Sequence, residues 1–150
     1  MKIINNNIFI EDKTLNFGMS FDEVYNILKG HIFTKKEPDD SDNGHIIVLH
    51  QDFYGLKGTC SLYFQNCTLK QIGLVPDWNM YFLVDNNYLP LPLGVKIKEI
   101  EEENDKELQK EFSLIYESDV NGKVFKIGNI CIIAAISRDF EQYSILIKEN

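Results

Sequence analysis

A few residues of this chain have side chains that could support metal binding. His45 and His50 lie five residues apart on a predicted strand, and this odd spacing directs them to opposite faces. Cys60, Cys67 and Cys131 are an odd number of cysteines without metal-ligating spacing, so we expect them to be free and packed as small apolar residues. The sequence therefore predicts no metal site and no cofactor.

Nucleophilic catalysis has equally little support in the sequence. His50 and Asp52 are close together, and Ser20 or Cys60 could be combined with them as a nucleophile. The chain has no nucleophile elbow, no glycine-rich phosphate loop and no His-Glu-x-x-His motif. We therefore expect no catalytic residue and no enzymatic activity. One alternative stays open, a small hydrolase or small-molecule-binding domain whose pocket is assembled from residues distant in sequence.

The charge of the chain favours a protein partner over other partners. A net charge of −8 argues against nucleic acid and against an anionic membrane. The stretch from Gly94 to Asp119 contains nine acidic residues and four lysines. This acidic stretch is either a solvated surface or a landing surface for a basic protein. The stretch from Pro76 to Leu93 is rich in aromatic residues, which either fill the core beneath a loop or anchor a partner. The predicted partner-binding residues are Trp78, Tyr81, Glu99, Glu101, Glu102, Glu103 and Asp105.

The elements that would position these residues begin with a clearly specified helix. Ser20 stands at a predicted N-cap, and Glu23 three residues later completes a capping box. An apolar stripe at helical spacing starts at Phe21 and ends at Leu28. Gly30 offers a left-handed stop.

The rest of the chain is typical of antiparallel strands with one further helix. We expect a short hairpin over residues 2–10, a three-stranded meander over residues 45–75, and strands over 124–127, 130–136 and 143–147. Asn104 is expected to cap a second helix from Asp105 to Glu117. The predicted fold class is α+β in a single domain of residues 1–150. Two main helices would pack on an antiparallel β-sheet, with a pseudo-duplicated α-β-β-β arrangement as one form of it.

Two short motifs carry a resemblance to a known family. They are Phe17-Gly18-Met19-Ser20-x-x-Glu23-Val24-x-x-Ile27-Leu28-x-Gly30 and Leu62-Tyr63-Phe64-x-Asn66-x-x-Leu69-x-x-Ile72. Together they resemble the helix-then-hairpin unit of the β-lactamase-inhibitor-protein-like and outer-membrane-lipoprotein-like small domains. The resemblance covers about half of the chain and implies a domain that binds other proteins. The chain departs from the secreted members in lacking a signal peptide and a lipobox cysteine.

The size and acidity of the chain are also similar to those of bacterial toxin-immunity proteins. It has no run of 18 apolar residues and no signal-peptide pattern, so we expect a cytoplasmic location and no membrane contact. The sequence as a whole predicts a non-catalytic protein-binding domain. Its most concrete form is an immunity protein that binds and neutralises a cognate basic toxin.

Overall fold

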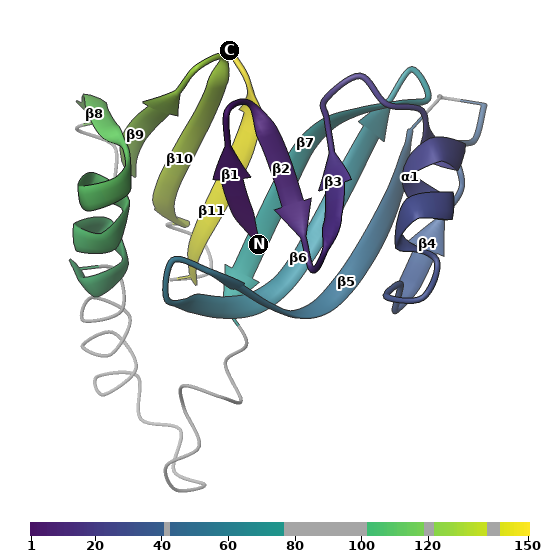
Figure 1. The fold of residues 1–150 in the computed structure, drawn as a ribbon, viewed down its shortest axis with the longest axis horizontal. Coiled ribbons are helices and arrows are strands. Elements are labelled where there is room, and N and C mark those ends of the chain that lie inside the picture. Colours follow the sequence, from purple (N-terminus) through teal and green to yellow (C-terminus); the bar gives the residue numbers. More distant parts are fainter. Residues whose placement is uncertain (41–42, 77–101, 119–121, 138–141) are drawn as a thin grey trace, which may run out of the picture.

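The structure, a computed structural model, consists of two antiparallel sheets and two short helices (Figure 1). It describes residues 1–40, 43–76, 102–118, 122–137 and 142–150. The smaller sheet has the strand order β1-β2-β3, and the larger has the order β4-β5-β6-β7-β11-β10-β9-β8. The described part of the second helix covers residues 102–111. The other elements are β1 (Lys2–Ile4), β2 (Asn7–Ile10), β3 (Lys13–Leu15), α1 (Phe21–Leu28), β4 (Thr34–Lys36), β5 (Gly44–Phe53), β6 (Leu56–Gln65), β7 (Thr68–Pro76), β8 (Ser113–Ser118), β9 (Gly122–Ile127), β10 (Ile130–Ser137) and β11 (Gln142–Glu149).

The expected fold class is wrong in its balance of helix and strand. We expected two main helices to cover one sheet, whereas eleven strands dominate the described chain and a second sheet provides much of the cover. Two features produced the error. Lys13–Leu15 is a third strand beside the expected hairpin, and residues 113–118 are strand β8 instead of the second half of a helix.

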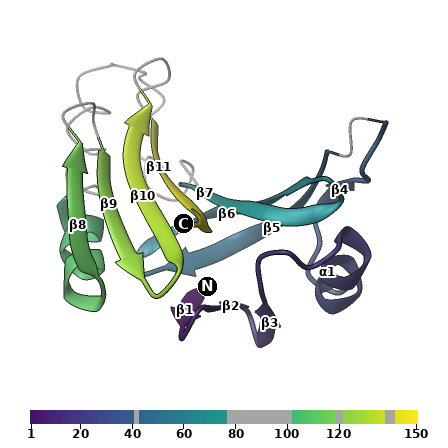
Figure 2. The same ribbon diagram turned by 90° about the horizontal axis from the view of Figure 1, so that it is seen from above.

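The core lies between the large sheet and the layer that covers one of its faces. The large sheet is strongly curved, and β1–β3 and α1 lie on one side of it (Figure 2). Alternation along each strand sends one residue in two into this core. The central row of inward-facing residues, paired strand to strand and fully buried, is Ile46, Leu62, Ile72, Ile147, Ile132 and Phe125. Each such side chain contributes roughly 1.5–3 kcal/mol through its removal from water.

The N-terminal hairpin forms where the asparagine triplet predicted it. Asn5 and Asn6 adopt φ values of 50° and 67°, so the turn between β1 and β2 uses the tolerance of asparagine for left-handed backbone. The Asn6 side chain also accepts a hydrogen bond of 2.9 Å from the Asn129 N–H. Gly128 is required beside it, because a Cβ there would lie 1.8 Å from Asn6 Oδ1. This contact ties the small sheet to the turn between β9 and β10.

Helix α1 begins as predicted and ends differently. Ser20 and Glu23 form the capping box, in which the Ser20 N–H donates to Glu23 Oε2 at 2.7 Å. Gly30 does not take a left-handed conformation. The helix instead closes through a bond of 2.7 Å from the His31 N–H to the Leu28 carbonyl, which satisfies that carbonyl without a glycine cap.

The second helix is displaced from its predicted bounds. Its described part covers residues 102–111, whereas 105–117 was predicted, and Asn104 is buried within it and does not serve as its N-cap. Ile115 continues the helical spacing of Leu108 and Phe112, but it lies in strand β8, at the register shift between Leu114 and Tyr116 in the pairing with β9. No helix in the described ranges is long and apolar enough to cross a membrane.

Candidate functional site

A buried polar cluster attaches the second helix to the sheets. Asn104 donates from Nδ2 to the carbonyl oxygens of Phe53 and Tyr54, at 3.3 and 3.2 Å. The Tyr143 hydroxyl lies 2.8 Å from Asn104 Oδ1 and 3.1 Å from Asp105 Oδ1. These bonds join the helix to the β5–β6 turn and to β11. They satisfy polar groups that would otherwise be costly to bury.

An ion pair completes this cluster. Lys123 Nζ on β9 lies 2.9 Å from Asp105 Oδ2, and the Asp105 side chain is only 5 % exposed. The carboxylate of Asp105 is therefore engaged on both oxygens by groups of this same chain. Its geometry gives it a structural role in holding the helix.

The remaining predicted partner-binding residues fall into two groups. Glu102 and Glu103 are exposed at the start of the described part of the second helix. Trp78, Tyr81, Glu99 and Glu101 lie outside the described residues. The structure thus separates Asp105, which faces inward, from its two exposed neighbours.

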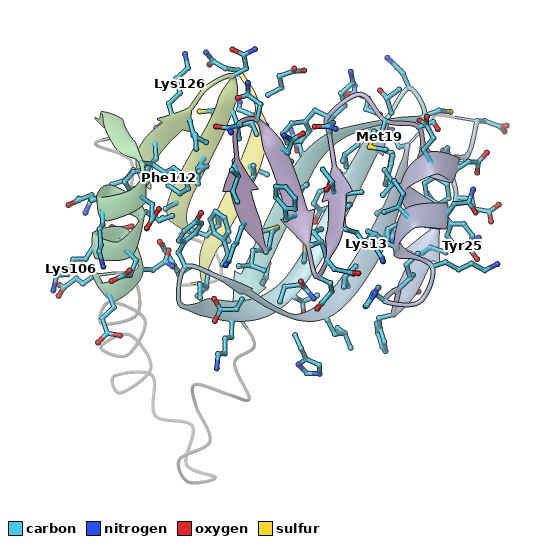
Figure 3. All side chains as sticks on the ribbon, viewed as in Figure 1. Lys13, Met19, Tyr25, Lys106, Phe112 and Lys126 are labelled. Atoms are coloured by element: carbon cyan, nitrogen blue, oxygen red, sulfur yellow. The ribbon has the colours of Figure 1, made fainter. Side chains whose placement is uncertain are left out.

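The exposed face of the second helix is predominantly acidic. Its outward-facing charged residues are four glutamates and two lysines: Glu102, Glu103, Lys106, Glu107, Lys110 and Glu111. Figure 3 shows Lys106 projecting from this helix away from the rest of the molecule. Lys110 lies 3.8 Å from Glu107, and both side chains are largely exposed, so this pair adds little stability. The helix therefore presents a net negative surface on a fixed support.

The two groups considered as nucleophiles, Ser20 and Cys60, are respectively engaged in a helix cap and buried in the core. Ser20 Oγ donates to Glu23 Oε2 at 2.8 Å and accepts from the Glu23 N–H within the capping box. Cys60 is fully buried, and burial raises the pKa of its thiol to about 12. Because the thiolate is the reactive form of cysteine, such a thiol is inert near neutral pH.

The residues suggested for an alternative pocket, His50 and Asp52, are both exposed. His50 is exposed at a bulge between Val48 and Gln51, with φ of 55°. The bulge shifts the alternation of β5, so that Gln51 takes the buried position and the simple odd-spacing argument for His45 and His50 fails. Asp52 is exposed and accepts a bond from the Gly55 N–H in the β5–β6 turn. Within the described ranges, no group of three or more His, Cys, Asp or Glu side chains could hold a metal ion.

A pocket of about 300 Å³ lies instead at the edge of the sheet face that the second layer leaves uncovered. It is formed by the ends of β4 and β6, the starts of β5 and β7, and Asn43 just before β5. Its lining residues are Lys36, Asn43, Gly44, His45, Tyr63, Phe64, Gln65, Lys70 and Gln71. This lining contains two lysines, a histidine and three amides but no carboxylate, so its chemistry suits an anionic group. Sequence analysis missed the pocket because its residues come from four separate strands.

No protein-family model, curated protein or solved structure matches this chain. The resemblance to the β-lactamase-inhibitor-protein-like domains therefore stays a prediction.

Proposed function

We propose that this chain is a non-catalytic protein-binding domain, an immunity protein that binds and neutralises a cognate basic toxin in the cytoplasm. The observation that carries the proposal is the rigidly attached acidic helix. Asn104 and Asp105 fix the inner side of the helix, and Glu102 and Glu103 are exposed on its outer side. A fixed acidic surface attracts a basic partner without first having to be ordered.

The roles in this proposal differ from residue to residue. Glu102 and Glu103 act as steering charges that raise the rate of encounter, and Asp105 supports them from within. On the sequence alone, Glu99 and Glu101 are proposed as further steering charges. Trp78 and Tyr81 are proposed as aromatic anchors on the same grounds.

The first experiment asks whether a toxin exists and whether this chain neutralises it. Reading frames that neighbour its gene are expressed singly and together with this chain, and cell growth is measured. We expect one frame to arrest growth alone and to be tolerated when this chain is present. Growth arrest by no neighbouring frame, or arrest that this chain does not relieve, would contradict the immunity proposal.

The second experiment tests the acidic helix with the purified pair. The variant Glu102→Lys/Glu103→Lys should slow association roughly tenfold at low salt, and the difference should shrink as salt screens the charges. The matched control is Asp40→Lys/Glu149→Lys, which changes the net charge equally at exposed positions away from this helix. Equal slowing in both variants would show that net charge alone, and not the helix, steers the partner.

A further inference from the structure

The face of the large sheet that the described part of β1–β3 and the helices leaves uncovered carries a line of strand-paired residues that includes three lysines and a histidine. In the strand order β4-β5-β6-β7-β11-β10-β9, the backbone register places one residue of each strand opposite one residue of the neighbouring strand. This line, called here the basic row, is Lys36, His45, Tyr63, Gln71, Lys148, Cys131 and Lys126. Each of its members from β5 to β9 directly precedes or follows a residue of the fully buried central row, so the basic row lies on the opposite face of the sheet, where Cys131 alone among the row members is buried, at 8 % exposed.

The positive charge of this row is only partly compensated. Lys36 Nζ lies 2.6 Å from Asp39 Oδ2. No ion pair among the described residues involves Lys126, Lys148 or the neighbouring Lys70. The next outward-facing row contains no charged residue, since its members are Thr34, Ile47, Ser61, Gly73, Leu146, Ile133 and Val124. A molecule with net charge −8 thus keeps a cationic band on one face.

One end of the basic row opens into the pocket described above. Lys36, His45, Tyr63 and Gln71 belong both to the row and to the pocket, and Lys70 adds a further ammonium group. Tyr63 is 45 % exposed, and a Cβ at Gly73 would lie 3.3 Å from its Cε2 atom. The aromatic ring therefore lies over the glycine, across the sheet surface. A side chain at position 73 would crowd it.

The dimensions of the row fit a short polypeptide. Six steps between neighbouring strands separate Lys36 from Lys126, which is roughly 29 Å at the usual strand spacing. An extended peptide covers that span with about nine residues. A long nucleic acid fits less well, because the net negative charge of the protein opposes a dense line of phosphates.

From the row, the pocket and the charge, we infer that the uncovered sheet face binds an acidic polypeptide segment running across the strands. Carboxylates of the segment pair with Lys126 and Lys148, and one carboxylate enters the pocket between His45 and Lys70. Tyr63 provides apolar contact between the two ends. This surface and the acidic helix have opposite charge and no residue in common, so the inference does not depend on the immunity proposal.

The test uses two fluorescein-labelled ten-residue peptides, one of alternating glutamate and serine and one of alternating glutamine and serine. Fluorescence anisotropy is measured with the full chain at low and at moderate salt. We expect the glutamate peptide to bind at least tenfold more tightly than the glutamine peptide at low salt, with a smaller difference as salt is raised. Equal binding of both peptides, or tighter binding of a single-stranded oligonucleotide of the same length, would overturn the inference.

Two charge-matched variants locate the site. Lys126→Gln/Lys148→Gln removes two charges from the basic row, and Lys106→Gln/Lys110→Gln removes two charges from the second helix. The first should weaken binding of the glutamate peptide about tenfold and the second less than twofold, if the row is the site. Equal weakening of glutamate-peptide binding in both variants would show that the peptide is attracted by lysines in general and not by the basic row, and it would overturn the inference. Glutamine keeps most of the lysine stem, and circular dichroism of both variants checks that they fold.

Discussion

The two helices of the described chain cover the same face of the large sheet but are attached to it by different kinds of contact. Helix α1 buries Phe21, Val24 and Leu28, and the Phe21 ring meets the Phe64 ring edge-on with centroids 5.0 Å apart. The second helix buries Leu108, and it also buries Asn104 and Asp105 in a hydrogen-bonded cluster. One helix is held by an apolar stripe and a cap, the other by polar groups that must all find partners.

This difference determines how specific each attachment is. Apolar packing tolerates side chains of similar volume, because it depends on area and shape. A buried polar cluster requires particular donors and acceptors at particular distances, and removal of one member leaves the others unsatisfied. The second helix is therefore the more precisely placed of the two, and it is the one that presents the acidic surface.

The largest expected effect follows from removing the carboxylate of the cluster. Asp105→Ala should lower the free energy of unfolding by about 2–3 kcal/mol, below the range for a fully buried pair because Lys123 is 28 % exposed. Urea unfolding followed by circular dichroism measures this. Glu107→Ala, on the exposed face of the same helix, serves as the control and should leave stability unchanged. If both variants were equally stable, the cluster would not be what holds the helix.

A smaller effect is expected from the hydroxyl group of Tyr143. Tyr143→Phe keeps the buried ring but loses the contacts with Asn104 and Asp105, which should cost about 1–2 kcal/mol. Combining it with Asp105→Ala should cost less than the sum of the two single changes, because both remove parts of one network. Strict additivity in this double-mutant cycle would mean that the cluster does not act as a unit.

The cap of α1 should matter less than the polar cluster. Ser20→Ala removes the acceptor for the Glu23 N–H, and we expect a loss of about 1 kcal/mol. Ser20→Thr retains the hydroxyl and should recover most of this stability in thermal unfolding. A loss as large as that of Asp105→Ala would remove the contrast between the two helices.

The smallest expected effect depends on pH. The Ser20 backbone N–H, and then its hydroxyl, hold the pKa of Glu23 below its ordinary value of 4.5. A lowered pKa in the folded state means that the ionised carboxylate stabilises the fold above pH 4.5 and that this contribution is lost as the pH falls through the folded pKa. Glu23→Gln should therefore unfold at a lower temperature than the natural chain at neutral pH, with the gap narrowing as the pH falls below 4.5 and Glu23 becomes protonated. A gap that stayed constant over this range would contradict the proposed role of the charge.

Local patterns predicted the elements whose determinants are close in sequence. The capping box at Ser20, the turn at Asn5 and Asn6 and the meander of β5, β6 and β7 each follow from residues a few positions apart. The second helix was misplaced because a strand residue can continue a helical period by chance, as Ile115 of β8 does after Leu108 and Phe112.

The sites were harder to predict than the strands. Asp105 belongs to an acidic run that is typical of a solvated surface, and nothing nearby indicates that Tyr143 and Lys123 bury it. The basic row is invisible in the sequence, since Lys36, Lys126 and Lys148 come onto one line across the sheet only through the register of seven strands.

The pairing of β7 with β11 has a consequence for how the chain folds. All other neighbouring strands of the large sheet are consecutive in the chain, whereas Leu74 lies opposite Ile145 and closes a long loop. Loop closure is costly in entropy before its contacts form, so the two groups of consecutive strands should assemble first and this seam last. In pulsed hydrogen exchange during refolding, the amide groups of β7 that face β11 should become protected later than those within the β5–β6 hairpin.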